Sequence, residues 1–134
     1  MKKENINRIY EKNQVINNII NAIVSRNSFL MLGHTNPDED CIASMVAFAL
    51  LVKKFDKSVS IYTSNTIPDN YQYLVNIARY NMIDVEYTDK NIPNDIDTIV
   101  ICDTPKTAMI KSTKKIDALM DSDNLLKIEI DHHI

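Results

Sequence analysis

The chain has 134 residues, 45% of them hydrophobic, and a formal net charge of −3. This length suits one hydrophobic core and argues against a second full domain, and the acidic balance argues against a general polyanion-binding surface. No apolar run is long enough for a membrane span and the first residues lack the apolar stretch of a signal peptide, so we expect a cytoplasmic protein without membrane contact.

Helical and extended patterns alternate along the chain. Apolar residues recur every three or four positions from Ile6 to Val24, which is typical of an amphipathic helix, whereas continuous apolar runs such as Phe29 to Leu32 are typical of buried strands. Strands separated by helices indicate an α/β fold, with a largely parallel sheet flanked by helices on both faces. The predicted helices are residues 6–24, 40–55, 70–80 and 107–120, and the predicted strands are residues 29–32, 58–63, 85–87, 97–103 and 126–131.

Three of the predicted strands end in ionisable residues. In open α/β sheets, ligands bind beyond the carboxyl ends of the strands. If these three strands are parallel neighbours, their polar ends meet at one edge of the sheet. The residues are His34, Asp38 and Asp40 after the first strand, Asp103 at the end of another, and Asp131, His132 and His133 after the last.

Carboxylates and imidazoles gathered in this way attract cations. Aspartate oxygens mixed with histidine nitrogens suit Mn²⁺, Fe²⁺, Co²⁺ or Zn²⁺ better than Ca²⁺. The candidate ligands exceed the needs of one ion. Two ions about 3.5–4 Å apart would use them and activate a hydroxide for in-line attack on phosphorus. The pattern therefore favours hydrolysis of a phosphoester or phosphoanhydride.

Each cluster also has a simpler interpretation. Asp38 or Asp40 could cap the helix that follows, and Asp103 could belong to an ordinary turn. The Asp-His-His sequence is harder to explain in this way, because three ionisable groups at the end of an apolar strand are costly without counter-ions. We expect the single glycine, Gly33, to form a tight turn in a packed place, and both cysteines, Cys41 and Cys102, to be reduced and buried.

Three segments resemble, in order and context, the first three motifs of the DHH phosphoesterase superfamily. The resemblance implies that His34 and Asp38 bind one metal ion, that Asp40 and His132 bind the other, and that Asp103 bridges them. It also implies two Mn²⁺ ions in the complete enzyme, with Mg²⁺, Co²⁺ or Zn²⁺ as alternatives. The segments are HTNPDEDCIAS (residues 34–44), ICDTP (residues 101–105) and IDHH (residues 130–133).

The same resemblance assigns catalytic roles to the two remaining residues of the last cluster. Asp131 would orient a neighbouring ligand, and His133 would stabilise the phosphoryl oxygens of the substrate. Glu39 replaces a common glycine and is expected to point to solvent.

Members of the superfamily continue past the DHH sequence to a fourth motif and a C-terminal DHHA1 domain. The 134 residues contain neither, so we interpret residues 1–134 as the N-terminal part of a DHH domain. We expect weak or no catalysis from this chain alone, because one ion would lack a ligand and the cleft would be open to water.

The preferred function is hydrolysis of short oligonucleotides or small nucleotide phosphoesters, as in the nanoRNase and bisphosphate phosphatase branch that Asp103-Thr104-Pro105 resembles. The first motif also resembles family II inorganic pyrophosphatases, which with exopolyphosphatases form the alternative, although those pyrophosphatases carry a histidine where Thr104-Pro105-Lys106 stands. A non-catalytic nucleotide-binding regulatory module and a plain structural domain are further alternatives. A homodimer is left open.

Overall fold

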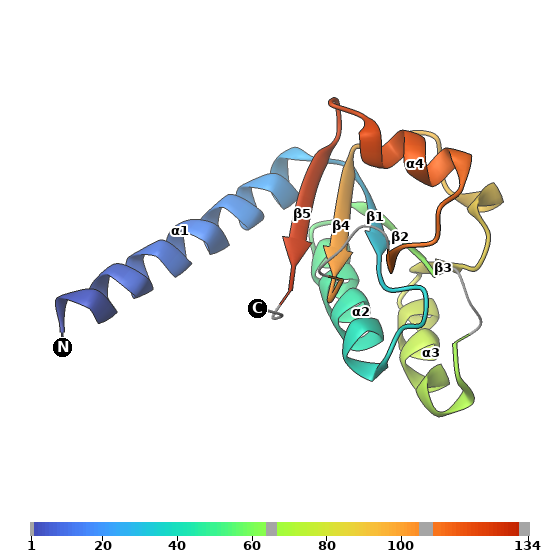
Figure 1. The fold of residues 1–134 in the computed structure, drawn as a ribbon, viewed down its shortest axis with the longest axis horizontal. Helices are drawn as coiled ribbons and strands as arrows, with labels where there is room; N and C mark the ends of the chain where they lie inside the picture. The colour runs from blue at the N-terminus through green and yellow to red at the C-terminus, as the bar shows by residue number, and fades with distance from the viewer. Residues whose placement is uncertain (1, 64–66, 105–108, 132–134) are drawn as a thin grey trace.

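The computed structural model describes residues 2–63, 67–104 and 109–131. In this part of the chain, five parallel strands form one sheet in the order β3-β2-β1-β4-β5 (Figure 1), which confirms the predicted α/β fold. The strands are β1 (Ser28–Leu32), β2 (Ser58–Tyr62), β3 (Asp84–Glu86), β4 (Thr98–Cys102) and β5 (Leu126–Ile130). The helices are α1 (Lys3–Ser25), α2 (Glu39–Lys54), α3 (Gln72–Tyr80) and α4 (Lys114–Asp121), with short 3-10 helices η1 (Asp69–Tyr71) and η2 (Asp89–Asn91).

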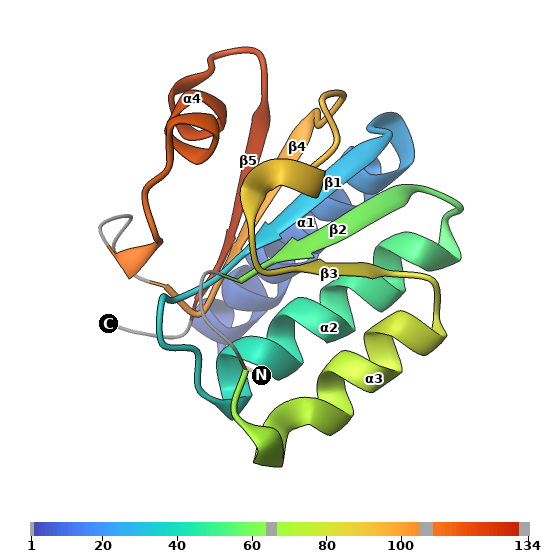
Figure 2. The ribbon, with the colours of Figure 1, turned by 90° about the vertical axis from the view of Figure 1, so that its right-hand side faces the viewer.

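The sheet separates two hydrophobic cores. Successive side chains of a strand point to opposite faces, so Phe29 and Met31 of β1 belong to the core under α2 and α3, whereas Leu30 and Leu32 belong to the core on the other face, with Ile116 of α4. Figure 2 shows α2 and α3 on one side of the sheet and α4 on the other. All five residues of β1 are buried, as expected of a central parallel strand.

The central position of β1 creates a topological switch point at the carboxyl edge of the sheet. The chain builds β2 and β3 on one side of β1, then returns to place β4 on the other side. Leu32 at the end of β1 pairs with Ile101 near the end of β4. The connections that leave these two strands run in opposite directions, which is the switch point where open α/β sheets bind ligands.

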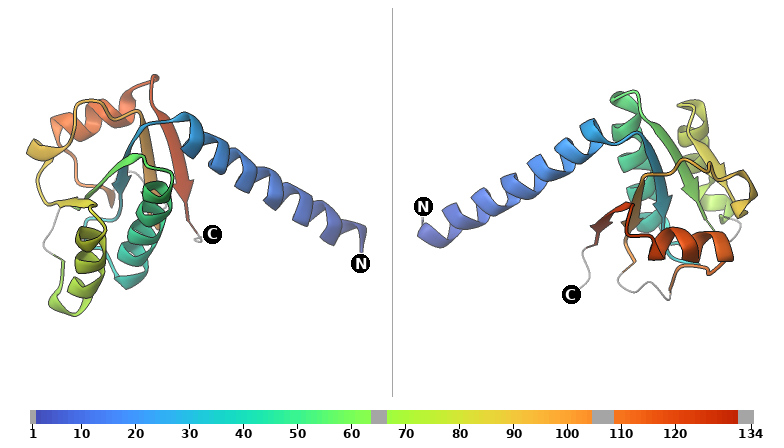
Figure 3. Two further views of the ribbon diagram at one scale, coloured as in Figure 1. Left: turned by 180° about the vertical axis from the view of Figure 1, so that it is seen from behind. Right: turned by 90° about the horizontal axis from the view of Figure 1, so that it is seen from above.

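α1 is the exception to the layered arrangement. It projects from the body of the molecule (Figures 1 and 3). Only its last turns contribute to the core, through Ile19, Ala22 and Ile23. No helix in the described residues combines the length and the apolar character needed to cross a bilayer.

The last predicted helix was placed too early in the chain. Residues 107–120 were expected to be helical, but the helix begins at Lys114, and residues 105–108 lie outside the described part. Thr113 is the N-cap and accepts a hydrogen bond from the Ile116 backbone N–H at 3.1 Å. Ser112 donates to Asp117 at 2.6 Å. Hydroxyl side chains that bond to nearby groups favour helix starts over helix interiors, which the apolar spacing alone did not reveal.

The carboxylate of Asp97 joins the amino-terminal ends of β1 and β4, at the edge of the sheet opposite the switch point. Asp97 accepts hydrogen bonds from the backbone N–H groups of Asn27 at 2.9 Å and Ser28 at 3.1 Å, and from the Thr98 hydroxyl at 3.0 Å. The backbone N–H of Asp97 donates to the Ser28 carbonyl at 3.0 Å. These bonds set the start of the pairing between the two strands that carry the candidate site.

Substituting Asp97→Ala should therefore destabilise the fold by about 2 kcal/mol, because two backbone donors lose a charged acceptor. Urea unfolding followed by circular dichroism measures the change. Asp95→Ala is the matched control, since Asp95 is exposed and accepts only a long bond of 3.4 Å from Ser28. Equal effects from the two substitutions would contradict this account of Asp97.

Candidate metal centre

Asp38 caps the helix that follows β1. Its backbone is extended (φ −85°, ψ 178°), and its Oδ1 accepts a hydrogen bond from the Cys41 backbone N–H at 2.8 Å. Glu39 and Asp40 lie in the first turn of α2, where the positive end of the helix dipole favours carboxylates. The capping role considered for Asp38 is thus confirmed. The cap bond uses Oδ1, one of the two carboxylate oxygens.

His34 is held by the loop between β1 and α2. The Asn36 backbone N–H donates to its Nδ1 at 3.0 Å. A neutral imidazole that accepts at Nδ1 carries its hydrogen on Nε2, so Nε2 has no lone pair to offer a cation in this arrangement. Binding a metal ion would require either that the ion replace the Asn36 N–H at Nδ1 or that the proton move to Nδ1.

Asp103 follows β4 in a conformation that few residues adopt. Its φ is 52°, in the left-handed region, where Asp is tolerated better than most residues. Its backbone N–H donates to the Ile130 carbonyl at 2.8 Å, and only 8% of its surface is exposed. A carboxylate that is both buried and held in an uncommon backbone conformation is the kind of local cost that proteins keep at functional sites.

Gly33 allows α2 to approach the end of β1. A Cβ atom at this position would lie 2.6 Å from Sγ of Cys41 and 3.1 Å from Sδ and Cε of Met45. The described chain has no glycine with positive φ, so the expected packed place is confirmed but a left-handed turn is not the reason for the glycine. The thiol of Cys41 also donates a long hydrogen bond of 3.5 Å to the Cys102 carbonyl at the end of β4.

The electrostatic environment of Cys41 shows how the acidic residues are arranged. Burial raises the pKa of its thiol to about 11, a backbone hydrogen bond with His34 opposes the rise, and the charges of Asp103, Asp38 and Asp40 add to it. Three carboxylates from two separate strand ends therefore act on one buried thiol. The clusters after β1 and β4 lie at the same carboxyl edge of the sheet, because the two strands are parallel neighbours.

The cluster after β5 is described only in part. Asp131 is exposed and directly follows the strand next to β4, whereas His132 and His133 lie outside the described residues. Among the residues that are described, no three His, Cys, Asp or Glu side chains are grouped closely enough to hold a metal ion. The donor types fit a divalent transition metal, but this arrangement would need a change at His34 and further donors to bind one.

Several contacts of the site were not anticipated from the sequence. The Tyr73 hydroxyl of α3 donates to Glu39, so Glu39 joins α2 to α3 instead of pointing only to solvent, and this bond raises the pKa of Tyr73. The Thr35 backbone N–H donates to the Met109 carbonyl at 2.8 Å, which links the loops that follow β1 and β4. No periodicity or motif in the sequence signals contacts between such distant residues.

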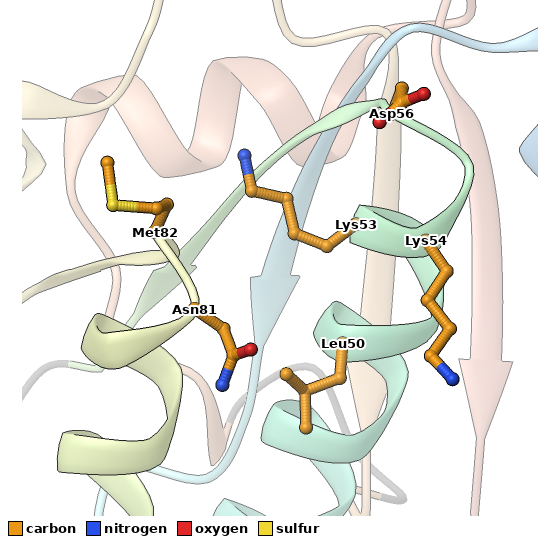
Figure 4. A pocket seen from close by; sticks show the side chains of 6 residues that line it. All are labelled: Leu50, Lys53, Lys54, Asp56, Asn81 and Met82. Atoms are coloured by element: carbon orange, nitrogen blue, oxygen red, sulfur yellow. The ribbon is translucent and has the colours of Figure 1, made fainter.

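A hollow lies at the other end of α2, away from the candidate metal centre. It has a volume of about 670 Å³ and shares no residue with the candidate metal centre (Figure 4). Its lysines belong to the last turn of α2, where cations favour the negative end of the helix dipole. The lining residues are Leu50, Lys53, Lys54, Asp56, Asn81 and Met82.

These features define an α/β domain in which aspartates follow the two adjacent strands at the switch point of a parallel sheet. The family model described as the N-terminal domain of the DHH family matches residues 28–134. The chain belongs to the DHH family, a group of metal-dependent phosphoesterases. No curated protein matches the chain.

Replacing Gly33 by Ala should destabilise the protein by about 1–3 kcal/mol, because the new methyl group would overlap Sγ of Cys41. Adding Cys41→Ala should recover part of this loss, since it removes the overlapping atom. Chemical unfolding of the two single variants and the double variant measures the coupling between them. Strictly additive effects would contradict the proposed overlap.

The stabilising contribution of the Cys41 thiol should decrease in alkaline solution. Its folded-state pKa is about 11, above the ordinary 9.0, so the thiol stays protonated in both states below pH 9 and its contribution is fully present there. Between pH 9 and 11 mainly the unfolded chain ionises, which lowers the free energy of unfolding. The free energy of unfolding of the wild type, relative to that of Cys41→Ala, should therefore fall as the pH rises. Urea unfolding of both proteins across this pH range measures the difference. A pH-independent difference would contradict the raised pKa.

Proposed function

We propose that the switch point between β1 and β4 is the metal-binding centre of a phosphoesterase that hydrolyses short oligonucleotides or small nucleotide phosphoesters. The observation that carries the proposal is that Asp38 and Asp40 follow β1 and Asp103 follows β4, two adjacent parallel strands whose carboxyl ends share one edge of the sheet. Negative charge concentrated at one edge of the sheet favours cations and, through them, phosphate groups.

The proposed ligands are those that the family resemblance implies. His34 and Asp38 would hold one ion, Asp40 and His132 a second, and Asp103 would bridge them. Mn²⁺ is the proposed ion, and when bound it would supply an activated hydroxide and charge neutralisation. Asp103 suits a bridging role because its backbone is fixed by the bond to Ile130.

The chain's own groups prepare the candidate site for this chemistry. Asp38 is fixed by its cap bond to the Cys41 N–H, so its carboxylate does not have to be ordered when an ion binds. Asp131 and His133 are proposed to act beside the ligands, Asp131 by orienting an imidazole and His133 by contacting the phosphoryl oxygens of the substrate.

The residue after Asp103 supports a nucleotide substrate over pyrophosphate. Thr104 is buried, and its hydroxyl donates to the Cys102 carbonyl at 2.8 Å, so it closes the turn after β4. A threonine used in this way supplies no imidazole to a pyrophosphate at the position where family II pyrophosphatases carry a histidine nearby.

Substituting Asp103→Asn or Asp38→Asn should weaken Mn²⁺ binding at least about tenfold, because each removes one negative charge and keeps the side-chain shape. Asn also preserves the left-handed backbone at residue 103 and the helix cap at residue 38. Isothermal titration calorimetry measures the affinity and the number of ions. Asp56→Asn is the matched control, since Asp56 is equally left-handed (φ 59°) but follows the far end of α2.

The same titration separates the proposal from its alternatives. Absence of Mn²⁺ binding by the wild type, or equal weakening by Asp56→Asn, would contradict the metal centre and favour a non-catalytic module. For the substrate class, the binding of a short RNA, a nucleoside 3′,5′-bisphosphate and inorganic pyrophosphate is compared in the presence of Mn²⁺, since little catalysis is expected from this chain alone. Preferential binding of pyrophosphate would overturn the nucleotide assignment and favour the pyrophosphatase alternative.

A further inference from the structure

α1 presents an apolar stripe that the body of the molecule does not cover. The helix has 23 residues, and Figure 3 shows it extending from the sheet in both views. Four isoleucines along its length are between 40% and 53% exposed, although isoleucine is among the residues most often fully buried. They are Ile6, Ile9, Ile16 and Ile20, and together with Asn13 they define what we call the α1 seam.

The spacing of the α1 seam is that of a coiled coil. Its five residues follow one another at intervals of three, four, three and four, which places Ile6, Asn13 and Ile20 at a positions of a heptad repeat and Ile9 and Ile16 at d positions. A strict repeat of 3.5 residues keeps a stripe aligned with a second helix that has the same repeat.

The middle of the α1 seam indicates what kind of helix would cover it. Asn13 is the one polar residue of the five and occupies the central a position. In a parallel, in-register pair, Asn13 faces the Asn13 of the second helix, and the two amides can hydrogen-bond. A single asparagine at an a position sets register and oligomeric state in this way, whereas an unrelated apolar partner would leave the amide buried against hydrocarbon.

The residues that flank the α1 seam are compatible with the same pairing. The e and g positions between Asn5 and Asn17 carry only one charge, on Lys12. In a parallel pair, Lys12 at g lies beside Asn17 at e of the other copy, so no like charges meet. The contacts of α1 with its own body are made in its last turns, by Ile19, Ala22 and Ile23. Ile23 occupies the d position that follows Ile20 and is fully buried, so the α1 seam ends where the body of the molecule covers the helix.

We propose that α1 joins two copies of this chain through a parallel coiled coil along the α1 seam. The two sheet domains then lie at the same end of the pair. The seam spans only two heptads, so the association is concentration-dependent and not permanent.

Sedimentation velocity of the purified chain between about 1 and 200 μM tests the proposal. The wild type should shift from monomer to dimer across this range, and Ile9→Lys combined with Ile16→Lys should remain monomeric at every concentration. Val15→Lys is the matched control, because Val15 is 56% exposed on α1 but lies outside the seam, and it should dimerise like the wild type. Unchanged circular dichroism and urea midpoints would show that the variants are folded.

Orientation is tested by a cysteine at one end of the seam, because only a parallel pair brings the two copies of an end residue together. Ile6→Cys should give a disulfide-linked dimer under mild oxidation, whereas Val15→Cys should not; the native Cys41 and Cys102 are buried. A wild type that stays monomeric at about 200 μM, a dimer that survives the double lysine substitution, or cross-linking through residue 15 in place of residue 6 would each overturn the proposal. A monomer that instead sediments with anionic phospholipid vesicles would assign the α1 seam to a lipid surface.

Discussion

The close approach of the first turn of α2 to the end of β1 is the constraint on which the candidate site depends. Gly33 has no side chain, so Sγ of Cys41 occupies space that a Cβ atom would need. The same thiol reaches the Cys102 carbonyl at the end of β4. One small buried residue therefore contacts both strand ends from which the acidic residues emerge. A larger side chain at either position 33 or position 41 would move the loop that carries Asp38 away from Asp103.

The candidate ligands differ in how firmly the fold holds them. Asp38 is tied to the start of α2 by its cap, and Asp103 is tied to β5 through its backbone. His34, in contrast, is held by one bond from Asn36 to the nitrogen that would have to change its partner or its proton for a cation to bind. The carboxylates thus form the fixed part of the candidate site, and the imidazole is the part that would adjust. Such a division is consistent with a site that becomes complete when an ion arrives.

Much of this arrangement could be predicted from the sequence, because short apolar runs bounded by turns identify buried strands and parallel strands place their carboxyl ends together. That reasoning located β1, β4 and β5 and the acidic residues after them. It missed the contacts that depend on three-dimensional packing. The pairing of Glu39 with Tyr73 joins residues 34 positions apart, and Cys41 was interpreted only as a small buried residue. The late start of α4 was missed because hydroxyl groups at its N-terminus compete with the apolar pattern.

The position of β1 at the centre of the sheet has a consequence for how the molecule folds. Asp97 bonds to the backbone of Asn27 across 70 positions of the chain, and the pairing of β1 with β4 closes a loop of the same size. Contacts so distant in sequence form slowly, because the chain entropy of closing the loop is lost before the contacts stabilise the product. During synthesis, the segment from His34 to Asp40 leaves the ribosome long before Asp103 does. The carboxylates of Asp38 and Asp40 are therefore synthesised well before Asp103, and the candidate site cannot form until β4 has been made.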